Sequence, residues 1–134
     1  MGVYVVSGAA SGMGRSTADQ LRWEGHRVIG VDLKNAEVTE DLSTVEGRAA
    51  AVEQILEQCG GRLDGAVLAA GLGPIPGREK LIANVNYLGI VELLEGMHPA
   101  LAAAGNAKVV IFSSNSTTTV PGIPDEILDA FEAR

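Results

Sequence analysis

The sequence predicts an α/β fold built around a doubly wound parallel sheet. Four short apolar runs, at residues 3–6, 28–31, 65–69 and 109–112, stand where buried strands are expected. None of the runs alternates polar with apolar residues, and such continuous runs are typical of strands that are covered on both faces. Helical patterns fill the gaps between the runs, and this alternation indicates a parallel sheet between layers of helices.

Three helices are predicted between the strands, over residues 11–24, 45–59 and 79–97. The segment 43–46, Ser-Thr-Val-Glu, has the pattern of a capping box at the start of the second helix. A further helical segment covers residues 125–134 and is unfinished at its end. Right-handed crossovers give the four strands, numbered along the chain, the expected order 3-2-1-4. We therefore expect one domain that contains the first four strands of a longer fold.

Composition and charge exclude several classes of protein. The net charge is −7 and no basic cluster is present, which argues against nucleic acid as a partner. No apolar run approaches the roughly 20 residues that a membrane span needs, and no signal peptide is visible. We therefore expect no membrane contact and a cytoplasmic location. The lone cysteine, Cys59, lies in an apolar helical stripe, so it is interpreted as a core residue. The sequence contains no Cys/His cluster of the kind that predicts a metal site.

A glycine-rich turn follows the first predicted strand and precedes the first predicted helix. Gly8 allows a tight turn, Gly12 lets the backbone approach a pyrophosphate, and Gly14 lets the helix pack closely. A flexible loop is the alternative, since the chain is rich in glycine. The position of the turn between strand and helix favours a phosphate-binding turn, and hence a Rossmann-type fold. The segment reads Ser7-Gly8-Ala9-Ala10-Ser11-Gly12-Met13-Gly14.

Asp32 stands 20 positions after Gly12, at the end of the second predicted strand. A carboxylate at this distance accepts hydrogen bonds from the ribose hydroxyls of NAD and repels the 2′-phosphate of NADP. The alternative is a turn or helix cap, which is a common role of aspartate. Arg15 and Lys34 are nearby cations of the kind that favour NADP. The position of Asp32 nevertheless predicts NAD as the cofactor.

The order of these motifs resembles that of the short-chain dehydrogenase/reductase family over essentially the whole chain. The glycine turn is similar to the family's TGxxxGxG motif, with Ser7 in place of threonine. Residues 68–71, Leu-Ala-Ala-Gly, resemble its NNAG segment, although both asparagines are alanine. The acidic-apolar pair that holds the adenine has its counterpart at 41–42. The resemblance implies cofactor contacts at Gly8, Ala9, Ala10, Ser11, Gly12, Met13, Gly14, Asp32, Leu33, Asp41, Leu42, Ala70 and Gly71.

Within that family, four stretches are similar to the bacterial 3α-hydroxysteroid dehydrogenases/carbonyl reductases, and coniferyl-alcohol dehydrogenases resemble them too. The stretches are residues 36–38, 41–48, 70–74 and 85–87. The resemblance implies a hydride transfer between a secondary alcohol, such as a 3α-hydroxysteroid, and NAD, with carbonyl reduction in reverse. The expected partner is therefore a small alcohol or ketone. The family and the two apolar sides of the helix 79–97 also imply a homodimer or homotetramer.

Two catalytic positions are implied by the resemblance, Ser114 after the fourth strand and Asn86 on the third helix. From the residues alone, Ser114 is equally a turn residue in a Ser/Thr-rich loop, and Asn86 equally a mid-helix amide bonded to nearby backbone. The family's Tyr-x-x-x-Lys pair is missing, because neither Tyr4 nor Tyr87 has a lysine four residues later. We therefore expect residues 1–134 to be the NAD-binding portion of a single-domain enzyme whose C-terminal half is absent, and to be inactive alone. The alternative is a non-catalytic NAD-binding module.

Overall fold

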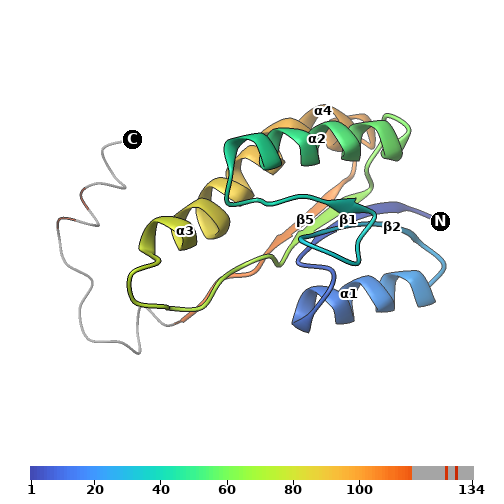
Figure 1. The fold of residues 1–134 in the computed structure, drawn as a ribbon. Coiled ribbons are helices and arrows are strands. Elements are labelled where there is room, and N and C mark those ends of the chain that lie inside the picture. The colour runs from blue at the N-terminus through green and yellow to red at the C-terminus, as the bar shows by residue number, and fades with distance from the viewer. Residues whose placement is uncertain (116–125, 127–128, 130–134) are drawn as a thin grey trace.

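The computed structural model of the protein describes residues 1–115 and positions 126 and 129. Apart from positions 126 and 129, the expected helix over 125–134 lies outside the described residues. Strands and helices alternate along the chain (Figure 1). The elements are β1 Val3–Ser7, α1 Gly12–Trp23, β2 Arg27–Asp32, β3 Val38–Thr39, α2 Val45–Cys59, β4 Gly65–Leu68, α3 Glu79–Ala83, the π-helical turn η1 Asn84–Leu88, α4 Gly89–Ala103 and β5 Lys108–Ile111.

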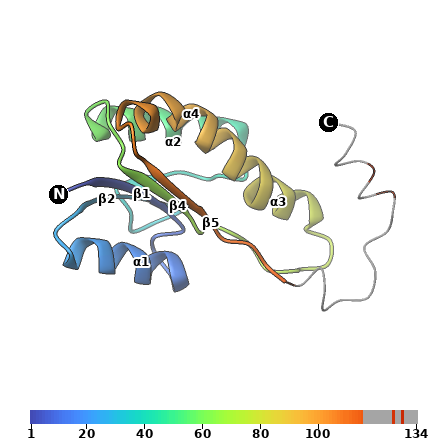
Figure 2. The same cartoon turned by 180° about the vertical axis from the view of Figure 1, so that it is seen from behind.

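The sheet is parallel throughout, with the strand order β3-β2-β1-β4-β5. Helix α1 covers one face, and α2 and α4 cover the other, as Figures 1 and 2 show from opposite sides. The doubly wound Rossmann-type fold is thereby confirmed. The carboxyl ends of β1, β2 and β4 meet at one edge of the sheet, where such folds bind their ligands. No helix among the described residues is long and apolar enough to cross a bilayer.

The expected strand order was wrong, because the sequence analysis missed β3. This strand forms only two residue pairs with β2, Val31 with Val38 and Asp32 with Thr39. A strand of two residues carries too little pattern to be recognised, although Val38 is fully buried. It occupies the edge position that had been assigned to residues 65–69. That segment, as β4, instead pairs with the other side of β1.

The start of α2 differs from the expected capping box by one residue. Thr44 is the N-cap, and its hydroxyl accepts a hydrogen bond of 2.9 Å from the amide of Gly47. The hydroxyl and the backbone amide of Ser43 are both bonded to the Asp41 carboxylate, the amide at 2.9 Å. The local turn at Asp41 therefore shifts the helix start to the next hydroxyl residue.

The predicted helix over 79–97 is longer than expected and contains a wide turn. It continues as α3, η1 and α4 to Ala103, through Pro99. The π-helical turn η1 contains Asn86, and such turns are frequent at functional sites. The second apolar edge of this helix, formed by Leu88, Val91 and Leu94, is half-buried within the chain. Leu94 packs against the core, so the chain itself covers part of that edge.

The main core lies between the sheet and the pair α2 and α4. Its fully buried side chains include Ile29, Ile55, Leu63 and Leu93, and Cys59 belongs to it as predicted. A smaller core lies under α1 and contains Val6, Ala9, Ala18 and Val28.

The buried guanidinium of Arg48 joins three segments around the main core. Its Nε donates to Glu92 Oε2 at 2.6 Å, and its Nη1 donates to the Leu42 carbonyl at 3.0 Å. Only 2% of the Arg48 side chain is exposed, whereas 36% of Glu92 is exposed. Arg48 therefore fixes the loop that carries Leu42 against α2 and α4.

Replacing Arg48 by methionine should lower the free energy of unfolding by roughly 1–3 kcal/mol, because it leaves the Leu42 carbonyl without its donor. Urea denaturation followed by circular dichroism measures this change. The matched control is Arg15→Met, whose partner Asp19 is 3.7 Å away on the surface of α1. That change should cost no more than about 0.5 kcal/mol. Equal losses in both variants would contradict the structural role of Arg48.

Asp64 ties the beginning of β1 to the beginning of β4. Its carboxylate accepts the Val3 amide at 2.8 Å and the Arg62 guanidinium at 2.7 Å. These two bonds, the Val3 amide first, lower the pKa of Asp64 below the ordinary value of 3.8. The charged form is therefore favoured in the folded state.

The pH dependence of stability should contain a contribution from Asp64. A lowered folded-state pKa stabilises the protein above pH 3.8, and this stabilisation is lost as the pH falls through the lower folded value. The variant Asp64→Asn should be less stable than the unmodified protein at pH 7, and the difference should shrink in strong acid. Urea denaturation from pH 7 to pH 2 tests this. A difference that stays constant with pH would be the contrary result.

Candidate functional site

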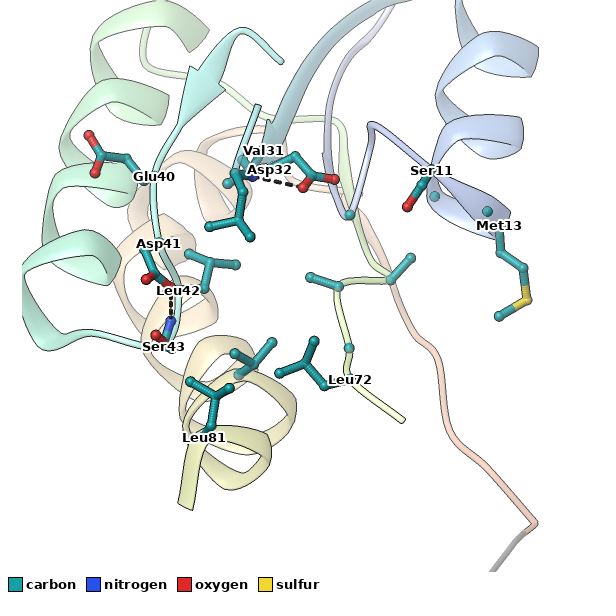
Figure 3. A pocket seen from close by; sticks show the side chains of 18 of the residues that line it. Ser11, Met13, Val31, Asp32, Glu40, Asp41, Leu42, Ser43, Leu72 and Leu81 are labelled. Carbon is teal, nitrogen blue, oxygen red and sulfur yellow. Dashed lines mark hydrogen bonds between the residues drawn. The ribbon is translucent and has the colours of Figure 1, made fainter. Parts of the chain in front are cut away.

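A cavity of about 520 Å³ opens at the carboxyl ends of β1, β2 and β4. Figure 3 shows the glycine turn on one side of it and the segment 41–43 on the other. Helices α3 and η1 form the remaining wall. The lining residues are Gly8, Ser11, Gly12, Met13, Gly14, Val31, Asp32, Leu33, Glu40, Asp41, Leu42, Ser43, Ala69, Ala70, Gly71, Leu72, Arg78, Leu81 and Val85.

The glycine turn has the backbone geometry that its spacing predicted. Gly8 has a φ of +71°, which favours glycine, and its amide donates to the Val31 carbonyl at 2.8 Å. A Cβ at Gly14 would lie only 2.1 Å from the Gly8 carbonyl oxygen, so α1 begins directly against the turn. A Cβ at Gly12 would meet nothing within 4 Å, which leaves that side of the turn open to a ligand.

Asp32 is fixed at the tip of β2 by two backbone amides. Its Oδ2 accepts from Ala10 at 2.9 Å, and its Oδ1 accepts from Leu33 at 2.7 Å. The first of these bonds connects the tip of β2 to the glycine turn. The carboxylate therefore lines the cavity in a defined orientation, with lone pairs remaining for a ligand hydroxyl.

The opposite side of the cavity carries Asp41 and Leu42. Hydrogen bonds from the hydroxyl and the backbone amide of Ser43 lower the pKa of Asp41 below its ordinary value. The carboxylate is thus an anionic acceptor at neutral pH. Leu42 is 6% exposed and belongs to the main core, which fixes the position of the neighbouring acceptor.

The segment after β4 is anchored without the asparagines of the family motif. The Ser7 hydroxyl, at the end of β1, accepts the Ala70 amide at 3.1 Å. Ser7 is 2% exposed, so this bond is shielded from water. The sequence analysis did not assign Ser7 to the site, although its hydroxyl holds one of the lining residues, Ala70.

Asn86 binds the same segment from η1. Its Oδ1 accepts the Leu72 amide at 2.8 Å, and its Nδ2 donates to the Leu72 carbonyl at 3.0 Å. The backbone that the amide contacts is 14 residues away, not within its own helix. Asn86 therefore positions the cavity wall at Leu72, and its side chain does not itself line the cavity.

Ser114 follows the end of β5 and is exposed. It is not among the described residues that line the cavity. Most of the Ser/Thr-rich loop that follows it lies outside the described residues. The structure places Ser114 just beyond the carboxyl end of β5, the strand next to β4.

Most of the predicted cofactor contacts line the cavity, but Ala9 and Ala10 do not. Ala9 is 7% exposed and packs in the core under α1, while Ala10 contributes its amide to Asp32. Several lining residues were not predicted from the sequence, and three of them, Arg78, Leu81 and Val85, lie at the start of α3, on α3 and on η1. The helical spacing of these three was visible, but no pattern in the sequence indicated which side of that helix would face the cavity. The missed residues are Val31, Glu40, Ser43, Ala69, Leu72, Arg78, Leu81 and Val85.

The residues present fit a dinucleotide such as NAD. The open turn at Gly12 and the nearby start of α1 suit a pyrophosphate, since a helix N-terminus attracts anions. Asp32 suits a ribose diol, and the apolar wall with Asp41 suits an adenine. The part of the chain that the structure describes contains no group of three or more His, Cys, Asp or Glu side chains that could hold a metal ion.

Several relatives share this sequence pattern. A 3-alpha-hydroxysteroid dehydrogenase/carbonyl reductase from Comamonas testosteroni is 42% identical over 117 residues, which are 85% of this chain and 44% of that protein. A coniferyl-alcohol dehydrogenase from Pseudomonas sp. strain HR199 is 39% identical over 108 residues, which are 76% and 40% of the two chains. The chain thus spans less than half the length of these two relatives.

Solved structures share the fold. A 3-alpha-hydroxysteroid dehydrogenase from Pseudomonas sp. B-0831 complexed with NADH superposes with a TM-score of 0.84 at 39% identity, covering 98% of this chain and 58% of that one. An L-sorbose reductase from Gluconobacter frateurii, complexed with NADPH and L-sorbose, has a TM-score of 0.78 at 23% identity and covers 88% and 54%. The latter likeness shows the fold alone. The model of the short chain dehydrogenase family matches residues 2–124, and the chain belongs to that family.

Proposed function

We propose that the protein is an NAD-dependent oxidoreductase acting on secondary alcohols, with a 3α-hydroxysteroid or a similar compound as substrate. Carbonyl reduction is the reverse reaction. The observation that carries the proposal is the carboxylate of Asp32, which two backbone amides hold at the cavity. The relative that is 39% identical and complexed with NADH supports the choice of cofactor.

Different residues of the chain bind different parts of NAD. The turn from Gly8 to Gly14 and the N-terminus of α1 receive the pyrophosphate, and Asp32 accepts the hydroxyls of the adenosine ribose. Asp41 accepts from the adenine, which lies against apolar side chains that include Leu33 and Leu42. Ala70 and Gly71 bring main chain close to the cofactor on the β4 side. These assignments rest on which residues line the cavity.

Two further residues are proposed for the reaction. When bound, NAD supplies the nicotinamide that accepts the hydride of the alcohol. Ser114 donates a hydrogen bond to the reacting oxygen from the carboxyl end of β5. Asn86 acts as a positioning residue, because its amide is bonded to the backbone of Leu72.

We also propose that residues 1–134 are the NAD-binding portion of a longer single-domain enzyme. The fraction of the relatives that the chain spans supports this, at 44% and 40%. The remaining portion then supplies the acid/base pair, the last strands and most of the substrate pocket. A cytoplasmic homodimer or homotetramer is the corresponding state of the whole protein.

A non-catalytic NAD-binding module is the second candidate. It is favoured by the two tyrosines of the chain, Tyr4 and Tyr87, which are not followed by lysine at the fourth position. General acid/base catalysis contributes about 10²–10⁴-fold to such reactions, so a protein without that pair binds the cofactor but turns over slowly.

Cofactor choice should depend on the charge of Asp32. The variant Asp32→Asn keeps an acceptor oxygen for a backbone amide but loses the charge that attracts ribose hydroxyls and repels a 2′-phosphate. We expect the ratio of the Kd for NADPH to the Kd for NADH to fall by about tenfold or more. Titration calorimetry with both cofactors measures this ratio.

The matched control for this change is Asp19→Asn, which removes the same charge from the exposed side of α1. The control should leave the ratio of the two Kd values unchanged. Asp32 would have no part in cofactor choice if both variants behaved alike.

Binding and turnover together separate the enzyme from the binding module. We expect the 134-residue chain to bind NADH but to reduce NAD with a hydroxysteroid at a negligible rate, because it lacks a Tyr-x-x-x-Lys pair. A longer product of the same reading frame that contains such a pair should show turnover, measured as absorbance of NADH at about 340 nm. A longer protein that binds NADH without turnover would favour the module.

In a longer protein that shows turnover, Ser114→Ala should lower kcat by roughly 10²-fold with little change in the Kd for NADH.

A further inference from the structure

One wall of the cavity is formed by the start of a helix. Arg78 precedes α3 as its N-cap, Leu81 and Val85 follow on α3 and η1 at spacings of three and four residues, and all three line the cavity. Figure 3 shows Leu81 well away from Ser11 and Met13, which mark the glycine turn. Leu81 therefore lies across the cavity from the glycine turn, where a pyrophosphate would bind.

The charges around the cavity are almost all negative. Asp32, Glu40 and Asp41 line it, and Arg78 is the one cation among the lining residues that the structure describes. Within residues 1–115 and positions 126 and 129, the guanidinium of Arg78 has no hydrogen-bond or ionic partner. In contrast, Arg48 is bonded to Glu92 and Arg62 to Asp64. Arg78 is thus an unpaired planar cation beside an apolar wall.

The side chains at this end of the cavity suit a flat, neutral ring. Leu81 and Val85 supply apolar surface, and the Asp41 carboxylate, whose pKa is lowered by Ser43, is an acceptor for an exocyclic amine. A guanidinium plane stacks favourably on an aromatic ring, by both dispersion and cation–π attraction. A phosphate is the other common partner of arginine, but the glycine turn offers the anion site.

We propose that Arg78 stacks on the adenine of NAD and closes the adenine end of the cavity, making it a determinant of cofactor affinity. This inference rests on the proposed function, since it concerns the same cavity. It assigns a role to Arg78, the N-cap residue of α3, which belongs neither to the glycine turn nor to the acidic positions. Arg78 acts here through contact with the base, not through the reaction.

The test compares ligands that contain the base with and without phosphates. In Arg78→Met the apolar stem remains but the planar cation is lost. We expect the Kd values of NADH, ADP and adenosine to rise by the same factor, roughly three- to thirtyfold. In Arg78→Lys the charge remains without the plane, so adenosine should stay weakened. Titration calorimetry of the full chain measures all three ligands.

Lys80→Met is the matched control, because Lys80 is exposed on α3 and does not line the cavity. Its Kd values should stay within about twofold of those of the unmodified protein. Thermal unfolding should be unchanged in Arg78→Met, which shows that any loss of affinity comes from the missing contact.

The possible outcomes separate this inference from the proposed function. If Arg78→Met weakened ADP but not adenosine, the guanidinium would bind phosphate, and the stacking would be refuted. If the unmodified protein bound NADH, and Arg78→Met bound NADH, ADP and adenosine as tightly as the unmodified protein does, only the inference would fail. If the unmodified protein bound neither NADH nor adenosine, the proposed function would fail, and the inference with it.

Discussion

The junction between the glycine turn and the tip of β2 determines the geometry of the whole cavity. The amides of Gly8 and Ala10 donate to the Val31 carbonyl and the Asp32 carboxylate, so that one main-chain contact and one contact to a side chain join the two strand ends. On the other side, the Gly8 carbonyl leaves no room for a Cβ at Gly14. Helix α1 must therefore begin directly over the end of β1, which brings its N-terminus to the cavity.

This junction also orders the Asp32 carboxylate at the cavity, as the proposed choice of cofactor requires. Each of its carboxylate oxygens already accepts one backbone amide, from Ala10 or from Leu33, which fixes the orientation of the group. A carboxylate has about four acceptor sites, so lone pairs remain for ribose hydroxyls. A ligand therefore meets an acceptor that is already ordered, and little conformational entropy is lost on binding. The Ser7 hydroxyl and the Asn86 amide order the wall on the β4 side in the same way.

The parts of the site that follow directly from local chain geometry were predictable from the sequence. Gly8 and Asp32 were recognisable because a strand end, a tight turn and an acidic residue stand at fixed distances along the chain. The contact between Asn86 and Leu72 was not, since it spans 14 residues and depends on how η1 faces β4. The edge strand β3 was missed because two residues carry no periodicity. Arg78 was missed because only the folded chain shows that the start of α3 meets the cavity.

The electrostatics of the cavity limit what can hold an anionic dinucleotide there. The chain has a net charge of −7, and three carboxylates, Asp32, Glu40 and Asp41, line the cavity. Long-range attraction therefore does not draw the cofactor in, and its affinity must come from short-range contacts. At the pyrophosphate these are main-chain amides and the start of α1, whose effect falls off within a helical turn. At the other end, in the proposed binding mode, they are contacts of apolar side chains and of Arg78 with the base. In such a site one planar cation, Arg78, affects affinity more through the ring that it covers than through the charge that it adds.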